Sequence, residues 1–244
     1  PPSVHSASYD GSLRALHASR SEWSLLYSSS DMEISAMALG PTGSVWLASN
    51  DGSAITFDER AGKVVQSPVA LHSRKVNTLS VCCGRGHLLA SAGSDNLVRV
   101  WDLRQLGAKA KGVAVHELPH SKSTQAAEWS PDGSSSLLTT CYDDRLRIFD
   151  GIHSAAPTER HAIKHCCQTG RWVVPFRATW SPAGDGVVVG GLRRTAELYA
   201  AAGGGRLGAL SSELMTAIPS RNTCHPSGRA VACATNSGRI HVYR

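Results

Sequence analysis

A repeated pattern constrains the fold of this chain more than any other feature. Each copy combines a strand of small or hydroxylated residues, a polar turn, and alternating residues that end on a large apolar side chain. The last residues of the copies are Leu16, Phe57, Trp101, Phe149, Tyr199 and Tyr243. Successive copies are therefore 41 to 50 residues apart. Such a period indicates one small supersecondary unit per repeat, which buries its apolar face only against its neighbours.

A second marker runs in step with the first. Tetrapeptides that contain both Pro and Gly follow alternating apolar strands at 40–43, 130–133, 181–184 and 225–228. Proline presets φ and glycine takes the conformation that other residues disfavour, so these tetrapeptides predict tight turns between strands. Two markers in phase, at a period near ~40–45 residues, are typical of the four-stranded blades of a WD-repeat β-propeller. The sequence thus predicts an all-β fold of this class.

The repeats also predict the extent of the domain. We expect a single propeller domain over residues 1–244, with repeats at approximately 1–30, 31–70, 71–118, 119–164, 165–211 and 212–244. Counting strands gives about 22 of the roughly 28 that seven closed blades need, or about 5.5 blades. The chain begins Pro1-Pro2 without Met, so we expect the missing strands to come from an N-terminal segment.

Two repeats carry residues that can form a buried hydrogen-bond chain. In the third repeat these are His72, Ser91, Asp95 and Trp101, where WD repeats place a His–Ser–Asp–Trp chain. The fourth repeat has His120, Thr139, Asp143 and Phe149 at these positions. A buried indole N–H needs an acceptor, and a short relay supplies one. We therefore expect these histidines to be structural, with no metal or catalytic role.

Several segments resemble one particular family of WD-repeat proteins. The segments are 120–123, 129–131, 138–141, 145–150, 169–172, 176–180 and 236–243. They resemble the WD repeat-containing protein 76 family and the related small subunit of the UV-damaged-DNA-binding complex. The sharpest match is 169–172 followed by 176–180, which together with 236–243 favours the protein 76 branch. Around 190–194 and in the low-complexity stretch 200–205 the chain departs from the family.

The resemblance implies a function as well as a fold. It implies a seven-bladed nuclear propeller that binds DNA and is associated with the response to DNA damage. It also implies docking to the large subunit of the damaged-DNA-binding complex, which is the adaptor of a cullin–RING ubiquitin ligase.

Two consecutive repeats hold candidate residues for adaptor docking. Trp101-Asp102-Leu103-Arg104 is a WDxR box, which contacts the adaptor in the family, and Phe57-Asp58-Glu59-Arg60 is a degenerate copy. The predicted docking residues are Asp58, Arg60, Asp102 and Arg104. A rim arginine can fork onto a carboxylate or backbone carbonyls of a partner. The alternative is that each Asp-x-Arg merely caps the end of its own strand.

An inserted loop carries the candidate DNA contacts. Lys164, Arg171 and Trp172 combine cations with an aromatic ring, as groove-inserting or base-stacking elements do. In the damaged-DNA-binding subunit the matching loop is a hairpin that wedges into the duplex, although its residues differ from those here. Alternatively, Trp172 packs between blades and Arg171 is solvated.

Further basic residues sit near blade starts and complete the predicted DNA-binding set. They are Arg177, Lys122, Arg74 and Lys75. Other basic residues near turns are Arg145, Arg193, Arg194 and Arg239. A net charge of +6 favours polyanionic partners such as nucleic acid. The alternative is a scatter of solvated charges.

Nothing in the sequence predicts catalysis, a metal or a cofactor. The seven cysteines include the adjacent pairs Cys82-Cys83 and Cys166-Cys167, which indicates a reduced intracellular protein. His165-Cys166-Cys167 has no second Cys/His pair at ligand spacing, so we expect no zinc site. We find no catalytic motif, and no apolar run of the ~18 residues that a membrane helix needs.

The sequence leaves two candidate functions. The first is a nuclear DNA-binding protein of the DNA-damage response that also serves as substrate receptor of a cullin–RING ubiquitin ligase. The second is a pure protein-interaction scaffold, in chromatin or in complex assembly, whose basic charge is incidental. A positive surface clustered around Arg171 favours the first function, and arginines spread over both faces favour the second.

Overall fold

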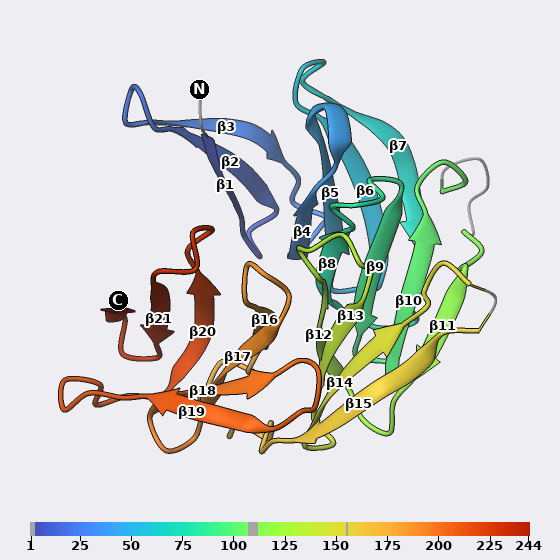
Figure 1. Ribbon diagram of the computed structural model, residues 1–244. Helices are drawn as coiled ribbons and strands as arrows, with labels where there is room; N and C mark the ends of the chain where they lie inside the picture. Colours follow the sequence, from blue (N-terminus) through green and yellow to red (C-terminus); the bar gives the residue numbers. More distant parts are fainter. Residues whose placement is uncertain (1–2, 107–111, 155) are drawn as a thin grey trace. The chain divides into compact units, whose positions relative to one another are not determined.

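The fold is the expected all-β one, built from the blades of a WD-repeat β-propeller. The computed structural model describes residues 3–106, 112–154 and 156–244. Over these ranges the chain forms 22 strands in six antiparallel sheets of three, four, four, four, four and three strands (Figure 1). Each sheet is one blade, and the described helical structure amounts to a single 3-10 turn at Pro41–Gly43.

The chain divides into two compact units. The first covers residues 1–81 and 86–118, and the second covers 82–85 and 119–244. Three sheets belong to the first unit. Their strands are β1 (Ser3–Ala7), β2 (Ser12–His17) and β3 (Glu22–Ser28); β4 (Ile34–Leu39), β5 (Ser44–Ser49), β6 (Ser53–Asp58) and β7 (Lys63–Ala70); and β8 (Val76–Val81), β9 (Leu88–Gly93), β10 (Leu97–Asp102) and β11 (His116–Pro119).

The second unit holds the other three sheets. Their strands are β12 (Thr124–Trp129), β13 (Leu137–Cys141), β14 (Arg145–Asp150) and β15 (Thr158–Lys164); β16 (Thr179–Trp180), β17 (Gly186–Gly191), β18 (Thr195–Ala200) and β19 (Arg206–Leu210); and β20 (Pro219–Cys224), β21 (Val231–Thr235) and β22 (Ile240–Tyr243). The innermost strand β16 has only two residues, because a long loop, 165–178, takes up the chain before it.

Each unit has its own apolar core between neighbouring sheets. In the first unit Trp46, Leu89 and Trp101 belong to one buried cluster. In the second, Phe176 and Trp180 are buried with aliphatic residues of β13, β14 and β17. Middle strands such as β9 are buried along their whole length. Their small and apolar residues suit strands covered on both faces.

Short polar turns join the second and third strands of the blades. In the β5–β6 turn, Asp51 Oδ1 accepts hydrogen bonds from the backbone N and the Oγ of Ser53, at 2.8 and 2.7 Å. Gly52 follows with φ of 94°, and a Cβ there would lie 2.1 Å from the carbonyl oxygen of His72. Only glycine fits both the conformation and the space.

The antiparallel order gives each sheet two ends with different connections. We call one the loop end, which carries the connections between sheets and the turns between second and third strands. In the second unit its segments are 120–123, 142–144, 165–178, 192–194, 211–218 and 236–239. We call the other the turn end, where first and second strands, and third and fourth strands, are joined. In the second unit it includes 130–136, 181–185, 201–205 and 225–230.

Candidate nucleic-acid interface

The third blade contains a complete hydrogen-bond relay. His72 Nδ1 lies 2.8 Å from Asp95 Oδ1, and His72 Nε2 lies 2.7 Å from Ser91 Oγ. Trp101 Nε1 donates to the same Ser91 Oγ at 2.8 Å. Burial opposes ionisation of Asp95, but the hydrogen bonds from His72 and Arg99 lower the pKa of this carboxyl well below its usual value. The relay fixes the two middle strands of the sheet, β9 and β10, to the loop before β8.

Two further relays occur in the second unit. His120 Nε2 lies 3.0 Å from Thr139 Oγ1, and the His120 ring meets Phe149 edge to face at 5.9 Å. The third relay was not predicted from the sequence. Buried His165 lies 2.9 Å from the Gly190 carbonyl and 3.3 Å from Tyr199 Oη. The signal was that His165 and Tyr199 hold the repeat positions of His72 and Trp101.

The loop 165–178 is fastened at both of its ends. Near its start, the Cys167 backbone N and the Gln168 side chain donate to Asp144, at 2.8 and 2.7 Å. At its end, Phe176 is fully buried and the Ala178 backbone N donates to Thr140 Oγ1 at 3.0 Å. Asp144 and Thr140 both belong to the blade of β12–β15, so the loop is held at both ends against that blade and its middle projects.

The tip of this loop exposes a cation and an aromatic ring together. Val173 N donates to the Gly170 carbonyl at 3.0 Å, which closes a turn with Arg171 and Trp172 at its corners. The Arg171 guanidinium lies 5.2 Å from the centre of the Trp172 ring, and Trp172 is 86% exposed. The alternative that Trp172 packs between blades is wrong. The turn places it at the corner, while Phe176 takes the buried position.

Exposed cations gather at the loop end of the second unit. Lys164, the last residue of β15, pairs in register with Arg145 of β14, so two like charges lie side by side. The exposed basic residues at this end are Lys122, Arg145, Lys164, Arg171, Arg193, Arg194 and Arg239. None of them forms an ion pair with another described residue. Arg177, half-buried, follows Phe176 at the root of the loop.

The turn end of the second unit is more acidic. It carries Asp132 and Asp185, and Asp150 pairs there with Arg160 at 2.5 Å. Exposed Arg85, Arg229 and Arg244 also lie at this end without an ion pair to a described residue. The loop end has seven such cations, so most of the unpaired positive charge of this unit is on the side that carries Arg171.

Arg74 and Lys75 belong to the first unit, so the structure does not join them to the other predicted DNA-binding residues. Both lie at the loop end of that unit, before β8. Arg74 is exposed. The Lys75 ammonium is bound by Tyr9: it donates to the Tyr9 hydroxyl and lies 4.9 Å from the centre of the ring.

The predicted docking residues lie at the turn end of the first unit. Asp58 Oδ1 accepts from the backbone N of Arg60 at 2.9 Å, and Asp102 Oδ1 accepts from that of Arg104 at 3.0 Å. Each aspartate thus caps the end of its own strand, as the alternative interpretation expected. Arg60 is exposed beside Gly43 of the neighbouring turn.

Arg104 folds back onto Asp102 and still faces solvent. Its Nε and Nη2 donate to the two Asp102 oxygens at 2.9 and 2.6 Å. These hydrogen bonds lower the pKa of Asp102 to about 2. The Arg104 side chain remains 68% exposed, and it borders a groove of about 510 Å³ lined by Pro41, Trp46 and Leu103.

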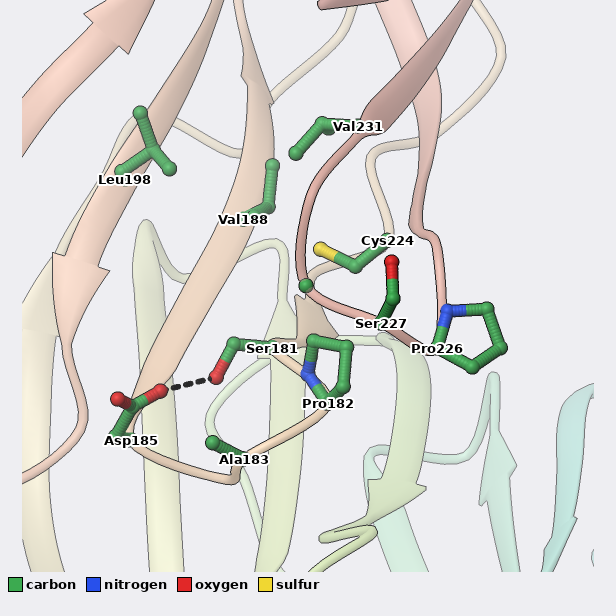
Figure 2. A pocket seen from close by; sticks show the side chains of 11 residues that line it. Ser181, Pro182, Ala183, Asp185, Val188, Leu198, Cys224, Pro226, Ser227 and Val231 are labelled. Carbon is green, nitrogen blue, oxygen red and sulfur yellow. Dashed lines mark hydrogen bonds between the residues drawn. The ribbon is translucent and has the colours of Figure 1, made fainter. Parts of the chain in front are cut away.

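A second hollow lies at the turn end of the second unit, between the blades of β16–β19 and β20–β22 (Figure 2). It holds about 490 Å³. Asp185 accepts from Ser181 Oγ at 2.6 Å, and Val188, Leu198 and Val231 give the wall an apolar character. Among the described residues that line it there is no histidine and no cation, so this hollow offers no positive charge for a phosphate.

The adjacent cysteines Cys166 and Cys167 differ in exposure. Cys166 is exposed and Cys167 is buried, and burial raises the pKa of the Cys167 thiol well above its usual range. Over the described residues, no three His, Cys, Asp or Glu side chains are arranged to hold a metal ion. The described part of the chain also has no helix long and apolar enough to cross a membrane.

Comparison with known proteins agrees with the blades. The family model of the WD domain, G-beta repeat, matches residues 63–102 and 112–150, which include the first two relays. WD repeat-containing protein 76 of Xenopus laevis is 32% identical over 248 residues, covering 98% of this chain and 42% of the relative. DNA damage-binding protein CMR1 of Coccidioides immitis is 28% identical over 285 residues, covering 100% and 51%.

A plant protein is similar over a shorter stretch. Protein DAMAGED DNA-BINDING 2 of Arabidopsis thaliana is 32% identical over 162 residues, which is 66% of this chain and 27% of the relative. The chain thus spans about half or less of the length of these relatives. Blades, relays and repeats define a WD-repeat β-propeller protein. It belongs to the family of WD repeat-containing protein 76 and is related to the damaged-DNA-binding WD-repeat proteins.

Proposed function

We propose that this protein is a nuclear DNA-binding protein of the DNA-damage response, and that it serves as a substrate receptor of a cullin–RING ubiquitin ligase. DNA, including damaged DNA, binds at the loop end of the second unit. The adaptor, the large subunit of the damaged-DNA-binding complex, binds at the turn end of the first unit. The protein acts as a binding scaffold without enzymatic activity, and chromatin proteins are further partners.

The loop 165–178 carries the proposal. A flat ring beside a guanidinium, on a turn that is fastened at both ends, suits insertion into a groove or stacking on a base. Because Asp144 and Thr140 already hold the loop, little ordering is needed on binding. Such preorganisation increases affinity. The names of the relatives, which refer to damaged DNA, support the same assignment.

The distribution of charge supports it as well. Phosphates are contacted by Lys and Arg, and each contact releases condensed counterions. A cation without an ion pair binds a phosphate more readily than a paired one, because no carboxylate of the protein has to be displaced first. The exposed cations around Lys164 meet this condition.

For the adaptor, the supporting feature is the pair of exposed arginines at consecutive blade turns. The Nε and Nη2 groups of Arg104 donate hydrogen bonds to Asp102. The rest of the exposed guanidinium lies beside the groove that Trp46 and Leu103 line. A partner with a carboxylate or carbonyl next to an apolar side chain fits this combination.

The DNA assignment is tested by two single variants of the full-length protein. Stacking contributes about 1–3 kcal/mol per base without charge, so Trp172→Ala should weaken DNA binding and leave its salt dependence unchanged. Lys164→Ala should lower the slope of log affinity against log salt by about one. Trp23→Ala is the matched control, since Trp23 is an exposed tryptophan (55%) of the first unit. Affinities for Trp172→Ala and Lys164→Ala equal to that of Trp23→Ala would reject the interface.

The adaptor assignment needs a separate experiment. Arg60→Ala combined with Arg104→Ala should abolish co-purification of the adaptor while the melting temperature changes little, because both side chains are exposed. Arg74→Ala, at the other end of the same unit, is the control and should retain the adaptor. Retained binding by a folded double variant would reject this docking surface.

A further inference from the structure

One arginine in the second unit is half-buried without a counter-charge. Arg221 lies near the start of β20, and its Nη1 donates to the carbonyl oxygens of Pro175, in the loop 165–178, and of Ser220. Over the described residues no carboxylate pairs with it. Figure 1 shows β20 beside β17, the second strand of the sheet that follows the same loop.

Arg147 of the same unit illustrates the usual arrangement. Its side chain is 12% exposed and pairs with Asp143 at 2.5 Å and with Glu159 at 3.3 Å. Removing a charge from water is costly unless an opposite charge and hydrogen bonds replace the solvent. Among the described residues, the hydrogen-bond acceptors of Arg221 are the neutral carbonyls of Pro175 and Ser220. Burial, together with the positive charge of Arg177, lowers the pKa of Arg221 to about 10, so the guanidinium is still charged at neutral pH.

The surroundings of this arginine offer further donors. Tyr142 lies within electrostatic reach of Arg221 and lines a cavity of about 290 Å³ with Lys122, Gln168 and Thr169. Lys122 is exposed and forms no ion pair with another described residue. The Oγ1 of Thr169 is buried and has no hydrogen-bond partner among the described residues. Two guanidinium groups, an ammonium and two hydroxyls thus come from three neighbouring sheets, at the end that carries Arg171.

We propose that Arg221, with Arg177 and the cavity side chains of Lys122, Tyr142 and Thr169, forms a binding site for a phosphate group. The phosphate is a backbone phosphodiester of the bound nucleic acid, so the inference rests on the proposed function and adds a residue to it. A guanidinium can hold a phosphate through two parallel N–H···O bonds. The bound anion supplies the counter-charge that the fold omits at Arg221.

The test measures DNA affinity against salt concentration for variants of the full-length protein. Arg221→Met removes the charge and keeps an unbranched side chain. It should weaken binding about 10- to 100-fold, the effect of one charged hydrogen-bonded contact. It should also lower the log–log slope by about one. Arg221→Lys should keep the wild-type slope and bind DNA more tightly than Arg221→Met. Lysine keeps the positive charge but cannot form the two parallel N–H···O bonds of a guanidinium.

Arg229→Met is the matched control. Arg229 is an exposed arginine in the turn that follows β20, at the opposite end of the same sheet, so the variant has the same net charge as Arg221→Met. It should bind like the wild type. Thermal unfolding of each variant verifies folding, and Arg221→Met should be at least as stable as the wild type, since it removes an uncompensated buried charge.

The outcomes separate this inference from the proposed function. If Lys164→Ala lowers the slope and Arg221→Met does not, the phosphate site is wrong and DNA binding stands. If the wild type binds no DNA, inorganic phosphate is tested alone. An increase of the melting temperature that requires Arg221 would then support the site with free phosphate as its occupant. No increase would reject both the site and the interface.

Discussion

Removing one hydroxyl from the relay of the third blade should be costly. Ser91 is fully buried and joins Trp101 Nε1 at 2.8 Å to His72 Nε2 at 2.7 Å. In Ser91→Ala both groups lose a partner where water cannot replace it, because Trp101 is 2% exposed. A buried polar group without a partner costs about 1–3 kcal/mol, so the variant should lose about 2–6 kcal/mol of unfolding free energy. That is a large part of the roughly 5–15 kcal/mol of a typical domain.

Denaturant unfolding of Ser91→Ala and of Ser30→Ala, an exposed serine of the same unit, measures this difference. A double-mutant cycle with Trp101→Phe isolates the relay, since Ser91→Ala should cost less when the indole N–H is already absent. A loss within about 0.5 kcal/mol of the Ser30 control, or an unchanged cost in the Trp101→Phe background, would refute the reasoning.

Two further predictions concern the second unit. Burial raises the pKa of Glu128 to about 7, against the hydrogen bond from Thr179. Because the folded state then holds a proton that the unfolded state releases above its pKa near 4.5, stability should fall by about 3 kcal/mol from pH 4.5 to 7, and Glu128→Gln should remove that slope in unfolding titrations. A Cβ on Gly190 would lie 1.8 Å from the Pro219 carbonyl oxygen, whereas nothing lies within 4 Å at Gly203. Gly190→Ala should therefore lose more than about 1 kcal/mol and Gly203→Ala almost none; equal melting temperatures would contradict the packing of β17 against β20.

The blades could be predicted because their signals are local. A turn such as Asn50-Asp51-Gly52 and the large apolar residue that ends each repeat depend on a few neighbouring residues. The period then reveals the architecture without any knowledge of long-range contacts. The inserted loop 165–178 lengthens the spacing from Phe149 to Tyr199 to 50 residues, but it leaves the pattern that follows unchanged.

Which side chains of the loop 165–178 are buried could not be predicted in the same way. Nothing in its sequence decided whether Trp172 or Phe176 would be buried, because the loop has no periodicity. The hydrogen bonds that Asp144 and Thr140 accept from the loop backbone decide it, and those two residues lie in another blade. The Asp102–Arg104 pair is a similar case. Sequence offered capping and docking as alternatives, and the structure shows that a capping aspartate and an exposed arginine coexist.

The environment of Arg221 could not be predicted from the sequence. No motif contains it, and an arginine in a strand carries no signal of its own. Two features distinguish Arg221 from an ordinary surface arginine. It has no carboxylate partner among the described residues, and it contacts Pro175, which is 46 residues away. Only the packing of β20 against the neighbouring blade brings these features together.

The salt dependence of DNA affinity of the full-length wild-type protein tests the central claim most directly. Seven exposed cations, Arg171 among them, lie at one end of the second unit without ion pairs to other described residues. If most of them contact phosphates of duplex DNA, log affinity should fall with log salt with a slope of about −4 to −6. A slope shallower than about −2, or no binding at low salt, would contradict an interface built from these residues.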